Sequence, residues 1–350
     1  MVQTILGIET SCDETAAAVV EDGVRVRSNV VHSQVNLHER WRGVVPEIAS
    51  RSHTMRILPI VQQALEDAGV AARDLDAIAV THRPGMVGCL LVGMAAAKAL
   101  ALLFDKPLLG VDHVQAHVHT AFLTAPDMLL PSLSLVASGG HTAMWLVRAP
   151  LDTERLGTTR DDAAGEALDK GAALLGLPYP GGPSIETTGL GGNRRAIDLP
   201  RSMLAPDSLD FSFSGLKTAL LYHLRGPGAV RPQPVLAPRE LRDLAASYQE
   251  AVVDVLIQKL VRAVKRHPVR SLSIGGGVAR NERLRERLQQ EPALRSLQLI
   301  LPPLSFCSDN GAMIALVGHF QLRQGLTAGL ELEPVATPQA GGKATSRSTR

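Results

Sequence analysis

Aromatic residues are scarce in this chain, and cysteines are scarcer still. Only 3% of the 350 residues are aromatic, so leucine, valine, isoleucine and alanine must fill the core. The three cysteines are Cys12, Cys89 and Cys307, and no two of them have the CxxC spacing. An odd number without that spacing argues against a disulfide framework and fits a reducing cytosol.

Charge of neither sign is in large excess, because the formal net charge is only +2 at pH 7. No global basic field points to nucleic acid, so any RNA contact must come from a local patch. A signal-peptide pattern is also missing, since the chain enters an apolar stretch at 4–8 without a basic N-terminal region. The most apolar run, 86–104, contains Gly88, Gly93 and Lys98. It predicts a buried helix of a cytoplasmic protein, with no membrane contact.

Three familiar motifs are missing as well. The sequence has no GxxxxGK[ST], which argues against a P-loop protein, and its glycine run 275–277 is not the GxGxxG of a dinucleotide site. A zincin-type metallopeptidase needs His-Glu-x-x-His, in which the glutamate is the base. Here Val114 follows His113, so the histidine spacing occurs without the carboxylate.

Alternating strand-like and helix-like segments predict an α/β fold made of two related halves. A strand, a polar turn and a second strand at 4–20 are repeated at 133–147. We expect an N-terminal domain at 1–130, a C-terminal domain with an inserted helical segment at 131–326, and a disordered tail at 327–350. Other expected elements are a helix at 54–68, a strand at 76–80, a turn at 82–85, a helix at 86–104, strands at 107–111 and 272–274, a helix from about 281, and a surface loop at 225–239.

Two histidines and one aspartate form a candidate metal site. On a helix, His113 and His117 are at i and i+4 and project from one face. Asp309, far along the chain, would add a carboxylate. Two imidazoles and one carboxylate suit Fe(II), Zn or Mn and leave coordination positions open for a substrate. A histidine pair alone is also common on solvated helix faces. The prediction of a metal site is therefore supported mainly by the glycine-rich turns that occur in the same sequence.

Glycine-rich turns occur three times, at 138–140, 181–182 and 275–277. Such turns expose backbone N–H groups and let a phosphate approach closely. A single turn of this kind is usually only a turn, but two of the three follow strand-like runs directly. Together they favour a nucleotide-binding cleft between the two domains.

Charged clusters leave two readings open. The acidic segment 161–170 could accept hydrogen bonds from ribose hydroxyls or could be the capped start of a helix. The segment 211–217 carries two phenylalanines beside two hydroxyls and could be a turn anchored in the core. Arg280, Arg283 and Arg287, and the pair at 194–195, could contact RNA phosphates or lie on solvated surfaces.

Several ordered motifs together resemble the tRNA N6-adenosine threonylcarbamoyltransferase family, known as TsaD in bacteria and once labelled O-sialoglycoprotein endopeptidases. The resemblance spans roughly residues 4–325. The motifs are Gly7-Ile8-Glu9-Thr10-Ser11-Cys12-Asp13-Glu14-Thr15, Val45-Pro46-Glu47-Ile48-Ala49-Ser50-Arg51, the His113–His117 helix, Ser138-Gly139-Gly140-His141-Thr142, Gly165-Glu166-Ala167-Leu168-Asp169-Lys170, Tyr179-Pro180-Gly181-Gly182-Pro183, Phe211 to Lys217, Gly276-Gly277-Val278-Ala279-Arg280-Asn281 and Cys307-Ser308-Asp309-Asn310.

This resemblance implies the fold of actin, Hsp70 and the sugar kinases, with duplicated RNase H-like domains around a nucleotide cleft. It implies transfer of a threonylcarbamoyl group from threonylcarbamoyl-AMP to N6 of adenosine 37 in tRNAs that read codons beginning with A. The substrates would thus be the adenylate and the tRNA anticodon loop. The partners would be a paralogous TsaB-like scaffold and a TsaE-like ATPase.

The resemblance also implies roles for individual residues. His113, His117 and Asp309 would bind one divalent metal ion per subunit. In this family the ion is usually iron, so Fe(2+) is expected. Asp13 would be the catalytic carboxylate, and Glu186 falls where some relatives carry an acid near the ribose. The adenylate would be bound by Val136, Ala137, Ser138, Gly139, Gly140, Asp169, Gly182 and Asn281.

Two positions depart from the family pattern. Relatives often have Glu-Gly where Gln115 and Ala116 stand between the histidines, which removes an acid near the metal and could lower its affinity. Relatives tend to have glycine where Arg83 stands, before Pro84-Gly85. The alternatives to the transferase are a metallopeptidase, as in the older family label, an ATP-dependent sugar-kinase-like enzyme, and a chaperone-like ATP binder.

Overall fold

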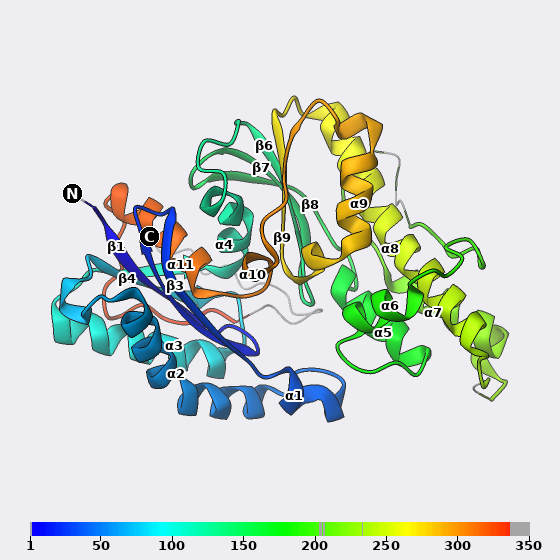
Figure 1. Cartoon of the computed structure of the whole chain (residues 1–350), viewed down its shortest axis with the longest axis horizontal. Helices are drawn as coiled ribbons and strands as arrows, with labels where there is room; N and C mark the ends of the chain where they lie inside the picture. The colour runs from blue at the N-terminus through cyan, green and yellow to red at the C-terminus, as the bar shows by residue number, and fades with distance from the viewer. Residues whose placement is uncertain (1, 203–204, 206, 233, 337–350) are drawn as a thin grey trace, which may run out of the picture.

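The backbone is organised around two five-stranded sheets, seen side by side in Figure 1. The structure is a computed structural model that describes residues 2–202, 205, 207–232 and 234–336. In the N-terminal sheet the strand order is β3-β2-β1-β4-β5, with the first three strands antiparallel and the last two parallel to β1. These strands are β1 (Thr4–Glu9), β2 (Glu14–Glu21), β3 (Arg25–Ser33), β4 (Ala77–Arg83) and β5 (Leu108–Asp112).

The C-terminal sheet repeats this arrangement strand for strand. Its order is β8-β7-β6-β9-β10, again with three antiparallel strands followed by two that run parallel to β6. Since both order and direction match, the predicted duplication of α/β halves is confirmed. The strands are β6 (Ser132–Ala137), β7 (Thr142–Ala149), β8 (Asp152–Thr158), β9 (Ser271–Gly275) and β10 (Gln298–Ile300).

Helices cover both faces of each sheet (Figure 1). Helices α2 and α3 pack on one face of the N-terminal sheet, and α11 packs on the other. The α-helices are α1 (Val35–His38), α2 (Pro46–Ala68), α3 (Val87–Phe104), α4 (His113–His119), α5 (Ala164–Leu174), α6 (Gly181–Gly189), α7 (Ser214–Arg225), α8 (Pro238–Arg266), α9 (Glu282–Gln290), α10 (Leu304–Cys307) and α11 (Gly311–Arg323). The 3-10 helices are η1 (Glu39–Trp41), η2 (Ala72–Asp74), η3 (Thr120–Leu123), η4 (Pro227–Ala229), η5 (Gly277–Arg280) and η6 (Pro292–Leu294).

Alternation along β1 divides the hydrophobic core into layers. Leu6 and Ile8 join the cluster beneath α2 and α3, whereas Ile5 joins the cluster that contains α4, α11 and part of the second sheet. Successive strand residues point to opposite faces, so a strand buried on both sides must be apolar throughout. A third cluster fills the outer face of the C-terminal sheet with side chains of α5, α7, α8 and α9.

Helix α11 crosses back from the second half to the first. A Cβ atom on Gly7 would lie 2.2 Å from the carbonyl oxygen of Gly311, so glycine at position 7 permits the close approach of helix and strand. The division at residue 130 remains a prediction for the domain limits. Helix α11 departs from it, because it lies in 131–326 by sequence but packs on β1, β2 and β4.

Residues 327–336 also pack on the N-terminal sheet, so the expectation of a disordered tail is wrong for them. Ala328 bridges to Leu108 of β5, and the Val335 N–H donates to the carbonyl of His82, 2.8 Å away. Leu332 packs in the core cluster beneath α2 and α3. The rest of the predicted tail, 337–350, lies outside the described residues.

Several element boundaries differ from those expected. Strands β3 and β8 were not predicted. Each is an edge strand, and its charged residues interrupt the alternation of apolar and polar residues by which a strand is predicted. Helix α2 begins at Pro46, eight residues before the predicted start at 54, because Pro46 sits at the favoured first position of a helix. The turn predicted at 82–85 begins later, since β4 runs to Arg83. Gly181 and Gly182 are not a turn but the first residues of α6.

Helix α3 is the one helix among the described residues that is long and apolar enough to cross a membrane. One of its faces packs against β4 and α2, with Leu90, Met94 and Ala97 buried. Its other face leaves Leu102 71% and Leu103 73% exposed. This one-sided burial is what the outer helix of an α/β layer shows.

Candidate metal and nucleotide site

The candidate metal ligands stand at the starts of two helices. Asp112 caps α4 by accepting the Gln115 N–H at 3.1 Å, so His113 becomes the first helical residue directly after β5. Asn310 caps α11 by accepting the Met313 N–H at 3.0 Å, which places Asp309 just before that helix. The two caps thus fix where α4 and α11 begin, and with them the positions of His113 and Asp309.

The structure brings His113, His117 and Asp309 into one group, with one ligand atom of each within 4.8 Å of the others. The Nε2 of His117 lies 3.0 Å from Asp309 Oδ1, and the Nε2 of His113 lies 3.6 Å from the same oxygen. The two imidazole rings meet edge to face, with centroids 4.7 Å apart. Both histidines are buried. The predicted group therefore exists, and its role as a metal site stays a prediction.

Glu9, at the end of β1, supports His113 from behind. Its Oε2 lies 2.9 Å from His113 Nδ1 and also accepts the Thr81 hydroxyl at 2.7 Å. The carboxylate is completely buried. A carboxylate on Nδ1 fixes the imidazole tautomer and leaves Nε2 as the ligand atom. Sequence reasoning gave Glu9 no role, although an acid closing an apolar strand was the available signal.

The charged groups of the site shift one another's pKa values. Burial alone would lower the pKa of His113, but the carboxylates of Asp309 and Glu9 outweigh burial and raise it to about 9. Burial would raise the pKa of Asp309, and the two imidazoles hold it well below its ordinary value. The group thus presents two carboxylates to its imidazoles, and this excess of negative charge favours a cation.

The residues fit a divalent metal ion by two further observations. The ring atom Nδ1 of His117 is buried without a hydrogen-bond partner, so the imidazole is held by packing with Nε2 toward Asp309. Mixed imidazole and carboxylate donors suit Fe(II), Zn or Mn. Gln115, one of the two expected departures from the family pattern, accepts the Thr153 hydroxyl at 2.9 Å. Glu9 supplies the supporting carboxylate that this departure seemed to remove.

Replacing Glu9 by glutamine should lower the affinity for a divalent ion about 10- to 100-fold, because the neutral amide no longer raises the basicity of His113. Titration with Co²⁺, followed by its absorption spectrum, measures this affinity. The exposed Glu47→Gln is the matched control and should bind as the wild type does. Equal affinity in Glu9→Gln and wild type would show that the Glu9 contact does not support the site.

Asp13 lies in the turn between β1 and β2, beside other acids. Burial raises the pKa of Glu14 well above its ordinary value, and Asp13 and Asp309 raise it further. The Ser33 hydroxyl donates to Glu14 at 3.3 Å and opposes this rise. Glu14 therefore lies within electrostatic reach of both Asp13 and Asp309, and acid–base chemistry favours such gathered carboxylates.

Two of the three glycine segments meet beside the metal group. The β6–β7 turn holds Gly139 and Gly140, where an added Cβ would meet nothing within 4 Å. Gly276, after β9, has φ +85°, and a Cβ there would lie 2.4 Å from the carbonyl oxygen of Ala137, so only glycine fits. The ring of His141, from the same turn, lies 6.5 Å from that of His113. Open backbone is thus placed next to the imidazoles.

The other predicted adenylate residues line helix starts nearby. Asp169 accepts the Gly181 N–H at 2.7 Å, and burial raises the pKa of this carboxyl to about 6. Gly182 follows in the first turn of α6. Asn281 caps α9 by accepting the Leu284 N–H at 2.9 Å. Glu186 accepts the N–H of Glu282, the first residue of α9, at 2.7 Å. Val136, Ala137 and Ser138 end β6 and begin the turn, with the first two buried.

Two of the arginines considered for RNA contact form ion pairs with acidic residues of α8. Arg283 makes a two-point contact with Glu250 at 2.7 and 2.9 Å, and Arg287 lies 2.7 Å from Asp254. Their charges are neutralised between α8 and α9, so neither of the two readings left open, RNA contact or a solvated helix face, describes Arg283 and Arg287. Arg280 lies before α9, in η5, with its side chain exposed.

The first two acids of the segment 161–170, Asp161 and Asp162, make structural contacts. Asp161 accepts the N–H groups of Phe213 and Ser214 at 2.7 and 3.2 Å, which fixes the start of α7. Asp162 pairs with Lys170 at 2.6 Å. Phe211 and Phe213 are buried and stacked, with ring centroids 6.3 Å apart. The core-anchoring reading of 211–217 is therefore confirmed. The capping reading is wrong in its detail, because α5 has no side-chain cap and Asp161 binds the start of α7 instead.

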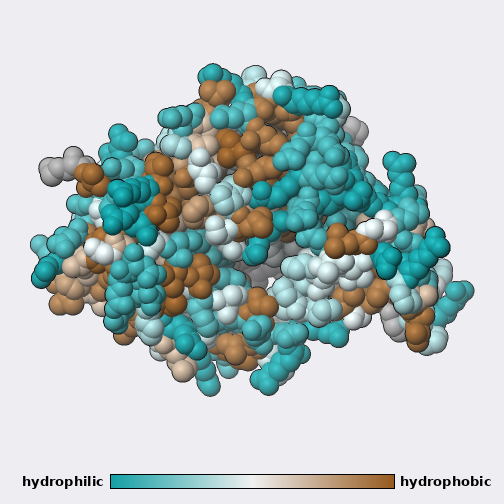
Figure 2. Space-filling view, in the orientation of Figure 1, coloured by the Kyte–Doolittle hydropathy of each residue, from teal (hydrophilic) through white to brown (hydrophobic). Residues whose placement is uncertain are grey.

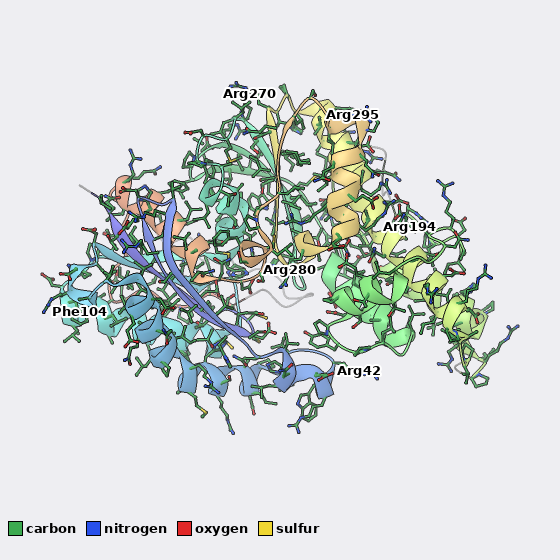
Figure 3. All side chains as sticks on the ribbon, viewed as in Figure 1. Arg42, Phe104, Arg194, Arg270, Arg280 and Arg295 are labelled. Carbon is green, nitrogen blue, oxygen red and sulfur yellow. The ribbon has the colours of Figure 1, made fainter. Side chains whose placement is uncertain are left out.

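Figure 2 shows the surface hollowed near its centre, where the two halves meet. Arg280 lies at this hollow in Figure 3, beside the start of α9. In Figure 1 the end of the β1–β2 hairpin lies on one side and α5 and α6 on the other. The hollow is thus bordered by elements that carry Asp13, Asp169 and Gly182.

Comparison with solved structures shows the fold. The chain is similar to full-length HypF in its phosphate- and nucleotide-bound form, with a TM-score of 0.61, 13% identity, and coverage of 93% of this chain and 56% of that chain. It is similar to component A of the Acidaminococcus fermentans (R)-2-hydroxyglutaryl-CoA dehydratase, with a TM-score of 0.53, 15% identity, and coverage of 92% and 99%. The predicted actin, Hsp70 and sugar-kinase type of fold is confirmed.

Comparison with sequences is far more specific. A tRNA N6-adenosine threonylcarbamoyltransferase of Anaeromyxobacter dehalogenans is 51% identical over 329 residues, which cover 94% of this chain and 97% of the relative. An enzyme of the same name from Bacillus cereus is 50% identical over 329 residues, with 94% of both chains covered. The family model TsaD, tRNA N6-adenosine threonylcarbamoyltransferase, matches residues 25–316. This chain belongs to the tRNA N6-adenosine threonylcarbamoyltransferase family.

Proposed function

We propose that this chain transfers a threonylcarbamoyl group from threonylcarbamoyl-AMP to N6 of adenosine 37 in tRNAs that read codons beginning with A. The observation that carries the proposal is the identity of about half of all residues to transferases of this name, over nearly the whole of both chains. The fold alone would not decide the matter, because one fold hosts many activities.

The candidate metal group supports this reaction. His113, His117 and Asp309 would hold one divalent ion, for which we propose Fe(2+). When bound, the ion would supply Lewis acidity for a carbonyl oxygen and would act as a template for the substrate. Glu9 would keep His113 in its ligating tautomer.

The glycine turns would hold the adenylate. Gly139 and Gly140 leave room for a ligand at their Cα atoms, and Gly276 shapes the adjoining turn. At the first turn of α6 and the start of α9, Asp169 and Glu186 accept the backbone N–H groups of Gly181 and Glu282, so these carboxylates would be the groups that meet the hydroxyls of the ribose. Binding AMP in this way stabilises it as the leaving group, and positioning contributes more than base strength because the adenine amine is a poor nucleophile.

Asp13 would accept the proton that the attacking amine loses. In the proposed step the adenosine N6 forms a bond to the carbamoyl carbon, and the bond from that carbon to the AMP oxygen breaks. AMP leaves with the electron pair, and the N6 proton passes to the Asp13 carboxylate. General-base help of this kind is worth about 10²- to 10⁴-fold. An anticodon-loop base is already unpaired, so presenting it costs little.

We further propose that the protein works in the cytoplasm beside a TsaB-like scaffold and a TsaE-like ATPase. An apolar surface on α2 and α3 supports a protein partner. It consists of exposed side chains on neighbouring helices: Met55, Leu58, Val87, Leu91, Leu102 and Leu103. Exposed apolar side chains gathered on two neighbouring helices are typical of a protein contact.

Reconstitution tests the function. The chain is mixed with tRNA, ATP, bicarbonate, labelled threonine, an adenylate-forming synthase and the two partner proteins. Label in the tRNA that depends on this chain is the expected result. Label that is absent although the synthase makes the adenylate would contradict the proposal.

The same preparation tests the alternatives. A sugar-kinase-like enzyme would transfer phosphate from Mg-ATP to a sugar without tRNA, and a metallopeptidase would cleave glycoprotein. We expect neither activity, because the site has the histidine spacing without the glutamate that a zincin requires.

A further inference from the structure

The turn that carries Asp13 is held by its backbone carbonyls. Ser11 O accepts the Met86 N–H at 3.0 Å, and Asp13 O accepts the Gln34 N–H at 3.0 Å. Between them, the carbonyl of Cys12 lies 2.9 Å from the ring atom Nε2 of His53. Of these three contacts, only the one to Cys12 comes from a side chain, and it comes from the middle of α2.

His53 is completely buried, and only one tautomer of its ring gives both nitrogens a hydrogen bond. Nε2–H donates to the Cys12 carbonyl, which leaves Nδ1 as an acceptor for the Thr15 hydroxyl at 2.8 Å. Burial lowers the pKa of His53, so the ring is neutral, as this arrangement requires. Both ring nitrogens therefore have partners, one on each side of Asp13 in the sequence.

A line of buried polar groups continues outward from His53. Gln34 Nε2 lies 3.5 Å from the His53 ring, and Gln34 Oε1 lies 3.4 Å from His38 Nε2. His38 Nδ1 in turn accepts the Val45 N–H at 3.3 Å. Gln34, His38 and His53 have no exposed surface. These contacts are longer than the two that His53 makes to the hairpin, so they secure its surroundings more than its orientation.

We propose that His53 is a positioning residue for threonylcarbamoyl transfer, which fixes the Asp13 carboxylate by holding the Cys12 carbonyl and the Thr15 hydroxyl. It touches neither substrate nor metal group and acts through the backbone of the turn. The proposal rests on the proposed function and on the role of Asp13 in it. Displacing a reacting group by about 1 Å can cost about 10²-fold in rate, which sets the expected effect.

A buried histidine with two partners could instead serve stability alone, so the variants must separate the two roles. His53→Leu has similar volume and removes both hydrogen bonds. His53→Gln keeps an N–H donor of similar reach to the Cys12 carbonyl. The exposed His223→Leu, on α7, is the matched control. All are assayed with full-length protein, the partner proteins and purified threonylcarbamoyl-AMP.

His53→Leu should lower kcat by about 10²-fold and change KM for tRNA by less than about twofold. His53→Gln should recover most of the loss, and Co²⁺ affinity should match wild type in both variants. Wild-type kcat in His53→Leu, or no recovery in His53→Gln, would overturn the proposal.

The deciding readout is a double-variant cycle. In the Asp13→Ala background, His53→Leu should add less than about a twofold loss, because the group that it positions is already gone. A loss as large as that in the wild-type background would mean that His53 acts on stability or elsewhere. Thr15→Val, which removes only the hydroxyl on Nδ1, is a milder second variant if His53→Leu does not fold. It should lose about fivefold, again only when Asp13 is present.

Failure of this inference is distinguishable from failure of the proposed function. If wild type transfers no label, the function is wrong and the cycle has no signal. If wild type is active and Asp13→Ala is equally active, the transferase stands, but His53 has no catalytic carboxylate to position and the inference is overturned.

Discussion

Asp13→Ala is expected to lower the rate of transfer by about 10²- to 10⁴-fold, the usual contribution of a general base. Binding of threonylcarbamoyl-AMP should persist, because the residues proposed to hold it lie on β6 and the turn after it, on α5 and α6, and directly before α9. Single-turnover transfer with preformed adenylate measures the rate, and calorimetry measures the binding. The turn itself should survive, since it is held through the backbone contacts of Ser11, Cys12 and Asp13.

Asp74→Ala, an exposed acid in η2, is the matched control and should retain the wild-type rate. Asp13→Asn adds a second comparison, because it keeps the shape and removes the base. Near-normal transfer in both Asp13 variants would remove Asp13 from the catalytic role. Glu14, whose pKa burial and Asp13 raise, would then be the next carboxylate to test.

Asp309→Asn is expected to abolish tight metal binding and to lower transfer by at least about 10²-fold, because the site loses its only charged ligand. It is a cleaner change than His113→Ala. Removal of His113 would leave the Glu9 carboxylate buried without its partner, which costs about 3–5 kcal/mol of folding stability. Asparagine keeps the shape of Asp309 and its Oδ1 acceptor for His117, so this replacement should disturb folding less.

Metal content after purification and Co²⁺ titration provide readouts apart from activity. The exposed Asp127→Asn is the control and should bind metal as wild type does. Removing metal from wild type with a chelator should reproduce the loss of transfer, and adding Fe²⁺ should restore it. Full transfer by metal-free protein would show that the His–His–Asp group serves structure alone.

Much of the N-terminal half of the site could be predicted from the sequence. Helical spacing placed His113 and His117 on one face, and the strand-turn-strand pattern placed Asp13 in a hairpin turn. The contact between His117 and Asp309 could not be derived from the sequence, because spacing along the chain says nothing about residues that lie 192 positions apart. Glu9 was overlooked since an acid at a strand end has no periodic signature of its own.

Other features depend on tertiary packing that no local pattern records. The edge strands β3 and β8 mix charged and apolar residues, so neither alternation nor an apolar run marks them. Gly181 and Gly182 begin a helix, where the carboxylate of Asp169 binds the free N–H of Gly181. Arg283 and Arg287 have the spacing of a solvent-facing helix stripe, but Glu250 and Asp254 of α8 neutralise them.

The measurement that most directly tests the central claim is the mass of the nucleosides from tRNA incubated with this chain, its partner proteins and purified threonylcarbamoyl-AMP. Two tRNAs that differ only at position 37, adenosine in one and guanosine in the other, are compared. We predict threonylcarbamoyladenosine in the first and no modification in the second. Unmodified adenosine 37, or equal modification of both tRNAs, would contradict the proposed function.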